Sequence, residues 1–395
     1  MDYRPGLQRV RESRWISLLL LAVTYHLVAS AAHLGFMSKW ALRDGEPFFG
    51  FEVVIEGEAY RPFAYRLLAP ELARLAAELV PSGVQGSLLA RFDLREHFGA
   101  VVSASHAGGH AFEYLVLYLL SYLGLLASAF LLRAVLLEVG FGRQRAALAP
   151  GLFVLAFPYI ETIGGYYYDS LEVAFLAGGV LFALRGSWLL LLLMTVPATL
   201  NKEAFLLFVP TLYPLLRQQL PVRRSALVVA GAGALALATN LVVKQGLSHL
   251  PGSPMQLQLG EHLAALLDPA TYTCLEVTYG LPGPEGFSPI SLLVIGLVVV
   301  RGWGELSLPV RRHLLLAACI NVPLFLAFCY PGELRNLSLL HVAFVGLLAG
   351  SLPASSGRGR GRLGDGPDAQ AQRVRPVRSA SQGPRRLGRT RTPNR

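Results

Sequence analysis

Long apolar runs alternate with short polar segments along most of the chain. The longest runs occupy residues 15–36, 112–137, 225–243 and 313–330. A helix needs roughly 20 apolar residues to cross a hydrocarbon core about 30 Å thick, so each run predicts a membrane-spanning helix. Shorter apolar runs occupy residues 146–160, 171–184, 187–200, 204–216, 288–300 and 337–350. The pattern therefore predicts an all-α integral membrane protein with about ten transmembrane helices, many of them short.

Composition points to the same class. Of the 395 residues, 53% are hydrophobic and 15% are charged, whereas soluble domains have about 45–50% apolar and about 25% charged residues. A soluble globular enzyme is thereby excluded. The three cysteines have no metal-ligand spacing, and two lie in apolar runs, so we expect neither a disulfide framework nor a metal site.

Arginine positions predict the orientation in the membrane. Four arginines lie in residues 4–14, before the first apolar run. This segment is too charged for a cleaved signal peptide, so we expect a retained first helix with a cytoplasmic N-terminus. Alternate loops on that side contain Arg143, Arg145, Arg185, Arg217, Arg223, Arg224, Arg301, Arg311 and Arg312. The positive-inside rule then predicts a multi-pass protein of the inner or plasma membrane with both termini in the cytoplasm.

The loops on the opposite side are predicted to be extracytoplasmic. They comprise about residues 37–111, 161–170, 201–203, 244–287 and 331–336 of a transmembrane domain spanning residues 15–350. In the first loop, residues 66–80 place leucines at helical spacing opposite Glu71, Arg74 and Glu78. This amphipathic pattern predicts a helix lying in the membrane interface, and a second such piece is expected within residues 88–98.

The C-terminal segment, residues 351–395, differs from the rest. From Gly357 onward it holds 11 Arg and two Asp, which leaves 24 basic and 23 acidic residues in the other 356. It has almost no large apolar residues, so we expect a disordered cytoplasmic tail that contacts anionic membrane lipids. No aromatic residue is interleaved with these arginines, so nucleic-acid binding is not expected.

Four polar clusters fall in the predicted extracytoplasmic loops. They are the acidic stretch 44–58 with R-P-F-A-Y-R (61–66), Y-Y-Y-D-S-L-E (166–172), N-K-E (201–203) and P-G-E-L-R-N (331–336). Charges beside a bilayer are costly, so they need partners or a wet cavity. Structural interpretations remain open. Lys202 and Glu203, or Glu333 and Arg335, could form ion pairs with each other or with Arg61 and Arg66 and so fix helices. The tyrosines could form an interfacial belt, and Asp169 could cap a helix.

Carboxylates combined with Arg and Lys suit a phosphate-bearing substrate. A carboxylate can deprotonate an attacking hydroxyl, while cations hold a phosphate and stabilise it as it leaves. The chain has no P-loop, no G-x-G-x-x-G after a strand, no H-E-x-x-H and no G-x-S-x-G. These absences argue against ATP hydrolysis, dinucleotide chemistry, zinc proteolysis and serine hydrolysis. No cofactor is expected.

The four motifs and their order resemble a bacterial group of integral membrane proteins similar to glycosyltransferases of the GT-C class. The likeness in architecture covers about residues 15–350, but in sequence it is confined to the motifs. It implies transfer of a sugar from a polyprenyl-phosphate carrier to a hydroxyl of a glycan, lipid or protein acceptor outside the cytoplasm, as in cell-envelope polysaccharide biosynthesis.

The resemblance also implies roles for individual residues. A first-loop carboxylate acts as base in that class, and the matching positions here are Glu52, Glu56 and Glu58. The class often has adjacent acidic residues in this loop, whereas these three are spaced, so the base stays open among them. The residues expected to bind the donor phosphate or the acceptor are Arg61, Tyr65, Arg66, Asp169, Lys202, Glu203, Glu333 and Arg335.

Two other functions fit the same charges. A transporter or flippase of a lipid-linked or anionic solute would line its path with them, but transporters often have internal repeats, and none is evident here. A polysaccharide polymerase or ligase would share the substrate chemistry, but its outer loops are usually rich in arginine. Here basic residues in the outer loops are matched by acidic ones, so the glycosyltransferase is favoured over both.

Overall fold

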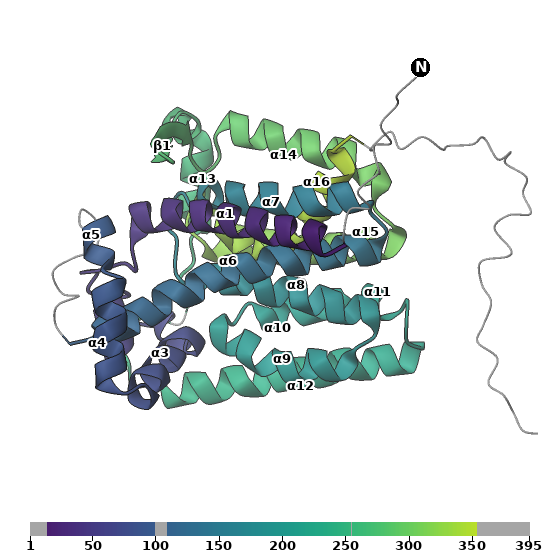
Figure 1. Cartoon of the computed structure of the whole chain (residues 1–395). Helices are drawn as coiled ribbons and strands as arrows, with labels where there is room; N and C mark the ends of the chain where they lie inside the picture. Colours follow the sequence, from purple (N-terminus) through teal and green to yellow (C-terminus); the bar gives the residue numbers. More distant parts are fainter. Residues whose placement is uncertain (1–13, 99–108, 254, 354–395) are drawn as a thin grey trace, which may run out of the picture. The chain divides into compact units, whose positions relative to one another are not determined.

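A computed structural model describes residues 14–98, 109–253 and 255–353 (Figure 1). The expected cytoplasmic segment before the first helix and the expected Arg-rich tail lie almost entirely outside these ranges. Part of the first extracytoplasmic loop also lies outside them. The predictions made for those segments stay predictions.

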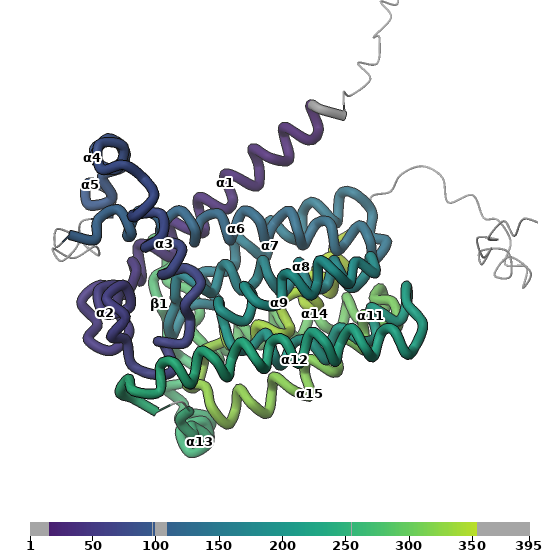
Figure 2. The backbone as a smooth tube through the Cα atoms, turned by 90° about the horizontal axis from the view of Figure 1, so that it is seen from below, coloured from purple at the N-terminus to yellow at the C-terminus, as the bar shows by residue number. Residues whose placement is uncertain are grey.

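The described part of the chain is mostly helical. Its longer helices are α1 (Arg14–Trp40), α6 (Ala111–Val139), α7 (Arg143–Ile160), α8 (Asp169–Arg185), α9 (Trp188–Asn201), α12 (Val222–Gly246), α14 (Pro289–Gly302), α15 (Leu308–Phe328) and α16 (His341–Ser351). Many of them run side by side (Figures 1 and 2). Helix α6 packs on α7 and α8, α1 on α7, α9 on α12, and α14 on α16.

Five helical segments in the described residues are long and apolar enough to cross a membrane. They are Ile16–Trp40, Ala111–Val139, Val222–Gly246, Leu308–Phe328 and Leu334–Ser351. Large apolar side chains on them remain exposed, among them Leu19 at 64% and Leu227 at 72%. Exposed apolar surface of this extent is what a bilayer covers. These five candidate spans indicate a membrane protein, and they account for only part of the expected ten.

Proline divides one of the shorter apolar runs. Residues 204–216 form α10 (Phe205–Phe208), the 3₁₀ helix η3 (Val209–Leu212) and α11 (Tyr213–Leu216) in succession. Pro210 and Pro214 have no backbone N–H to donate, which interrupts a regular helix. A 3₁₀ helix, η6 (Leu334–Leu340), likewise leads directly into α16.

The first loop folds into short helices. They are α2 (Phe51–Glu56), η1 (Phe63–Tyr65), α3 (Leu68–Leu79), α4 (Ser82–Arg91) and α5 (Leu94–Phe98). The predicted amphipathic helix is present as α3, which buries Ala69 and Ala73 and exposes the leucines of its other face. The expected second piece is split instead, because the Asp93 side chain accepts from the backbone N–H groups that begin α5.

The all-α prediction misses one hairpin. After α13 (Leu259–Leu267) and η4 (Pro269–Tyr272), strands β1 (Leu275–Thr278) and β2 (Leu281–Pro284) pair antiparallel. The two-residue turn, Tyr279–Gly280, has positive φ at both positions, as tight hairpin turns require. Lys39 of α1 holds the hairpin through a 2.7 Å ion pair with Glu276. Strand β2 was not predicted because its sequence, L-P-G-P, is poor in strand-forming residues.

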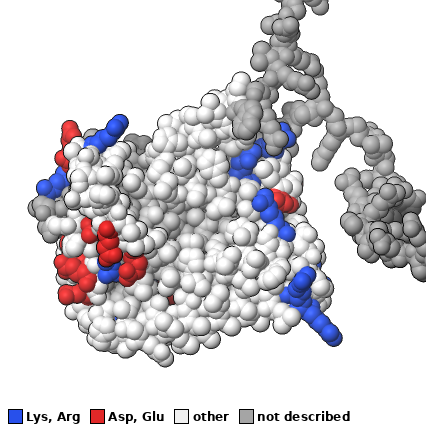
Figure 3. Space-filling view, turned by 60° about the horizontal axis from the view of Figure 1, so that its bottom comes forward, with Lys and Arg blue, Asp and Glu red and all other residues white. Residues whose placement is uncertain are grey.

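Charged side chains are not spread evenly over the helices. Both ribbon views place α2–α5 and the α13–β2 segment at the same end of the long helices (Figures 1 and 2). On the face in Figure 3, acidic groups gather at that end, basic groups gather mainly at the opposite end, and an uncharged band lies between. This is the distribution that the predicted orientation requires, with the basic end in the cytoplasm.

The predicted orientation can be tested with native cysteines. Cys274 is exposed between α13 and β1, whereas Cys319 is exposed on α15, within a candidate span. In a Cys329→Ala background, a membrane-impermeant maleimide should label Cys274 in right-side-out vesicles, and Cys274→Ser should remove the label. Cys319 should not react, because a membrane-impermeant reagent does not enter the hydrocarbon core in which this candidate span would lie. Labelling of Cys274 only in inverted vesicles would show that the orientation is opposite to the predicted one.

Candidate functional site

A buried carboxylate, Asp169, lies where α8 begins. It is 1% exposed. Arg335 Nη1 donates to both of its oxygens, at 3.3 Å and 3.1 Å, and Lys202 Nζ lies 3.2 Å from Oδ1. The backbone N–H of Tyr166 donates to Oδ2 at 3.1 Å. Asp169 thus joins two buried cations that come from distant parts of the sequence.

Lys202 connects Asp169 to a second buried carboxylate. Its ammonium lies 2.7 Å from Glu172 Oε2 and 3.4 Å from Asn336 Oδ1. The other oxygen of Glu172 accepts a 2.6 Å hydrogen bond from the Ser338 hydroxyl. With Asp169, these contacts give the three N–H groups of Lys202 three oxygen partners.

Arg335 connects Asp169 to Glu333. Its Nη2 donates to Glu333 Oε1 at 3.1 Å. The second oxygen, Oε2, accepts from Asn336 Nδ2 at 2.8 Å and from the backbone N–H of Tyr330 at 3.3 Å. Glu333 is therefore saturated by its own loop and by Arg335.

Arg66 and Glu203 form a second pair at the edge of this group. Arg66 Nη2 lies 3.5 Å from Glu203 Oε1, and Nη1 donates to the hydroxyl of Tyr168. The Lys202 ammonium lies 5.8 Å from the centroid of the Tyr168 ring, so Tyr168 lies between the two pairs. We call the set Arg66, Asp169, Glu172, Lys202, Glu203, Glu333 and Arg335 the charge network.

Aromatic rings support the arginines of the network. Tyr166 stacks on Phe63 and on Tyr168, with centroid distances of 5.4 Å and 5.2 Å. The guanidinium carbon of Arg335 lies 4.6 Å from the Tyr166 centroid, and that of Arg66 lies 4.7 Å from the Tyr168 centroid. Cations placed over ring faces are stabilised electrostatically. The tyrosines are buried, which argues against a lipid-facing aromatic belt.

Local backbone structure brings the network together. Helix α9 ends at Asn201, and Lys202 is extended, with φ −159° and ψ 128°. The Asn201 side chain donates to the carbonyl of Tyr168 at 3.1 Å, which ties the end of α9 to the start of α8. Asn321 of α15 donates to the carbonyl of Asn336 at 2.8 Å and so positions the loop that holds Arg335.

Electrostatic interactions keep Lys202 and Glu203 charged. Burial alone lowers the pKa of Lys202, but Glu172 and Asp169 raise it above its ordinary value. Burial alone raises the pKa of Glu203, yet the Arg66 guanidinium and neighbouring groups lower it overall. Mutual compensation is what makes buried charges tolerable.

Several residues predicted for the site lie elsewhere. Glu56 and Glu58 are exposed beside the end of α2, and Glu52 accepts from the backbone N–H of Gly45 at 3.2 Å. Arg61 Nη2 donates to the carbonyl of Gly252 at 2.8 Å. Tyr65 is buried, with Lys244 Nζ 5.6 Å from its ring centroid. The structure thus brings together Arg66, Asp169, Lys202, Glu203, Glu333 and Arg335 of the predicted set.

The structural alternatives are partly realised. Lys202 and Glu203 do not pair with each other but with Asp169, Glu172 and Arg66. Glu333 and Arg335 do pair. Asp169 does not cap α8: it is the first residue of the helix and accepts from the backbone N–H of Tyr166, which precedes the helix. The charges therefore fix helix positions and form one connected group at the same time.

Glu161 is a buried carboxylate that is not among the residues predicted for the site. It is 2% exposed directly after α7. In the part of the chain that the structure describes, its carboxyl group has no hydrogen bond or ion pair. Burial, and next the charge of Asp169, raise the pKa of Glu161 well above its ordinary value, against the effect of nearby Arg335. Its sequence signal, an acidic residue at the end of an apolar run, is the same one that marked Asp169 and Glu203.

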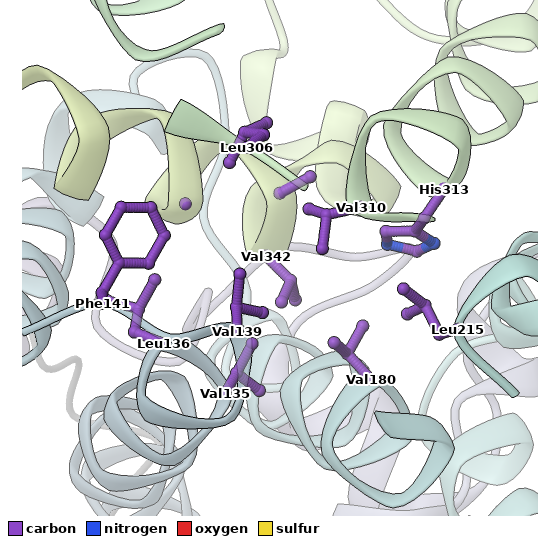
Figure 4. Close-up of a pocket in the computed structure, with 12 residues that line it drawn as sticks. Val135, Leu136, Val139, Phe141, Val180, Leu215, Leu306, Val310, His313 and Val342 are labelled. Carbon is purple, nitrogen blue, oxygen red and sulfur yellow. The ribbon is translucent and has the colours of Figure 1, made fainter. Parts of the chain in front are cut away.

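A pocket between the described helices has a different character. It lies between α6, α8, α11, α15 and α16 (Figure 4). Its lining includes Val135, Leu136, Val180, Leu215, Val310 and His313. His313 Nδ1 is within 2.8 Å of the carbonyl of Thr211, and no Lys, Arg, Asp or Glu lines the pocket. It is a packing gap between helices rather than a site for charged substrates.

Neither a metal site in the described residues nor a known relative indicates a function. Within the described ranges, no group of three or more His, Cys, Asp and Glu could hold a metal ion. No protein-family model matches the chain, and searches of curated proteins and of solved structures found no match. The function must therefore be inferred from the charge network itself.

Loss of the central carboxylate should destabilise the protein strongly. Asp169→Asn removes the charge that compensates Arg335 and Lys202, and breaking a buried pair costs about 3–5 kcal/mol. As a control, Glu138→Gln removes the exposed 2.6 Å pair with Arg185 and should cost less than about 1 kcal/mol. Thermal unfolding in detergent would measure both, and equal effects would contradict a structural role for Asp169.

Stability should depend on pH through Glu161. The folded protein holds the Glu161 proton more tightly than the unfolded chain. This contribution to stability is therefore complete below the ordinary pKa of about 4.3 and is lost as pH rises through the raised value in the folded state. Glu161→Gln cannot ionise, so its melting temperature should increasingly exceed that of wild type as pH rises. The exposed-residue control Glu78→Gln should show no such trend, and a constant difference for Glu161→Gln would refute the assignment.

Proposed function

We propose that the protein is a membrane glycosyltransferase that transfers a sugar from a polyprenyl-phosphate carrier to a hydroxyl group of a glycan, lipid or protein acceptor. The reaction would occur at the end of the helices that carries α2–α5, on the extracytoplasmic side of the inner or plasma membrane. In this proposal the shorter apolar helices cross the membrane as well, which gives about ten spans with both termini in the cytoplasm.

The observation that carries the proposal is the buried charge network. Three cations and four carboxylates are concentrated where several membrane helices end. Intramembrane and near-membrane charges are costly and usually serve function. Lipid-facing leucines on α3, at the same end, supply a surface on which a lipid-linked donor can approach.

The proposed reaction is a displacement at the anomeric carbon. A carboxylate accepts the proton of the acceptor hydroxyl, whose oxygen bonds to C1 of the sugar while the bond from C1 to the phosphate oxygen breaks. The lipid phosphate leaves with its electron pair, and Arg66, Lys202 and Arg335 stabilise its charge. Asp169, Glu203 and Glu333 hold those cations in place or orient the acceptor. Arg61 and Tyr65 would contribute to substrate binding from the first loop.

Four carboxylates are candidates for the base. Glu52, Glu56 and Glu58 belong to the first loop, as the resemblance implies, and two of them are exposed to incoming acceptors. Glu161 is the fourth: it lies near Asp169 and Arg335, and in the described residues its carboxyl group makes no hydrogen bond or ion pair that an acceptor hydroxyl would have to displace. The two groups predict different inactive variants, so activity measurements can choose between them.

A transfer assay on purified protein in lipid nanodiscs tests the proposal. A panel of polyprenyl-phosphate sugars is offered, and release of sugar from the carrier is followed. Wild type should turn over one donor, and Arg335→Lys should lower turnover at least about tenfold, because Lys cannot make the forked contacts to Asp169 and Glu333. Arg185→Gln, which removes a charge of an exposed pair, should retain activity.

The same assay identifies the base and the competing function. Among Glu52→Gln, Glu56→Gln, Glu58→Gln and Glu161→Gln, the variant that stays monodisperse but loses turnover names the base. Full activity in all four would refute the carboxylate step. Binding of the carrier by wild type without turnover of any donor would instead support a transporter or flippase.

A further inference from the structure

One cation beside the charge network lacks a carboxylate partner. Arg66, Lys202 and Arg335 each form at least one ion pair. Arg43, which follows α1, forms none in the described part of the chain. Its Nε donates to the carbonyl of Gly165 at 3.0 Å. Both terminal nitrogens of its guanidinium are therefore available to a ligand.

Gly164 brings Arg43 next to the network. A Cβ atom at Gly164 would lie 2.9 Å from Arg43 Nη2, 3.5 Å from Glu333 Oε1 and 3.8 Å from Arg335 Nε. Three charged groups thus surround one glycine, and any side chain there would collide with the Arg43 guanidinium. The backbone φ of Gly164 is +151°, a conformation that other residues rarely adopt.

The Arg43 side chain is held in position by aromatic rings. Its guanidinium carbon lies 4.0 Å from the Trp40 ring centroid and 4.9 Å from that of Tyr166. Tyr166 also carries Arg335 at 4.6 Å. Two arginines therefore share one ring, and Arg43 is only half-buried, which leaves it accessible from outside.

The backbone at Arg43 is strained. Its φ is +63°, in the left-handed region, which is unfavourable for a residue with a Cβ. Such strained residues persist where the surroundings enforce them and cluster at ligand sites. Here the Arg43 N–H donates to the carbonyl of Trp40 at 2.9 Å and fixes the turn.

We infer that Arg43 binds the phosphoryl group of an anionic substrate beside Gly164, with Arg335 Nε as a second donor. Arg335 Nε is buried and has no hydrogen-bond partner. The carboxylate of Glu333 does not compete, because Arg335, Asn336 and Tyr330 already donate to it. A guanidinium fork matches two phosphoryl oxygens, and in the described residues no ion pair occupies the guanidinium of Arg43.

This inference rests on the proposed function and names the residue that holds the phosphate of its donor. It also separates two roles among the cations. Lys202 spends its three N–H groups on Asp169, Glu172 and Asn336, so it fixes the helices and stabilises a phosphate through its charge rather than through a hydrogen bond. Arg43 is the cation whose charge changes the free energy of anion binding most directly.

Binding measurements in nanodiscs test the assignment. Affinities are determined for a polyprenyl monophosphate, for the polyprenol of the same chain length, and for inorganic phosphate. Wild type should bind the lipid phosphate at least about tenfold more tightly than the polyprenol, since hydrogen bonds between charged groups are stronger than those between neutral groups. Arg43→Gln should abolish this preference, and Arg43→Lys should restore part of it.

Control variants define how the inference fails. Arg91→Gln, an exposed arginine of the same loop, should bind like wild type, and Gly164→Ala should weaken phosphate binding by displacing the guanidinium. A phosphate preference that survives in folded Arg43→Gln overturns the inference while leaving the proposed donor intact. Absence of any preference in wild type overturns both.

The remaining outcomes show whether the bound phosphate belongs to a lipid carrier and whether the protein transfers a sugar. Loss of the preference in Arg43→Gln, without sugar transfer by wild type, supports the anion site and overturns only the glycosyltransferase. Equal affinity for inorganic phosphate and lipid phosphate supports Arg43 as the anion-binding group and shows that the lipid chain adds nothing. Tighter binding of the lipid form identifies the carrier as the source.

Discussion

The compensation of the Asp169 charge is the constraint on which the rest of the structure depends. A carboxylate that is 1% exposed is tolerable only with cations and donors in contact. Arg335 and Lys202 supply them, and they lie 166 and 33 residues away in sequence. The start of α8, the end of α9 and the start of η6 must therefore meet at one depth. Short helices that end there satisfy this requirement, and longer apolar helices would carry their ends past it.

The sequence predicted the members of this network better than their partners. Polar motifs between apolar runs, with a topology drawn from arginines elsewhere, pointed to Asp169, Lys202, Glu333 and Arg335. Pairing follows from tertiary geometry. In the extended backbone at Lys202, neighbouring side chains point to opposite sides. Lys202 therefore reaches Asp169 and Glu172, while Glu203 turns to Arg66. Of the two pairings left open by the sequence, the one between Lys202 and Glu203 is therefore absent, and the one between Glu203 and Arg66 is present.

Other parts of the structure left little trace in the sequence. Spacing could not show which carboxylates are buried: Glu161 and the exposed Glu56 both follow apolar residues, yet only Glu161 is covered by the segments around α7. The hairpin after α13 depends on the Lys39–Glu276 contact over more than 200 residues and on a turn at Tyr279–Gly280. The number of spans is also hard to predict from the sequence. Five spans are evident from helix length and composition, whereas the shorter apolar helices cannot be assigned as spans in this way.

Charge compensation by carboxylates also determines which cation is available to bind a ligand. Within the network, each cation is balanced by carboxylates, so an arriving phosphate would have to displace an existing partner of Lys202. Displacement leaves a buried charge unpaired, which is costly. Arg43 needs no displacement, because its guanidinium is held by Trp40, Tyr166 and the Gly165 carbonyl rather than by an acid. Aromatic rings position a cation without neutralising it. The structure thereby separates charges that hold the helices from a charge that is available for recognition.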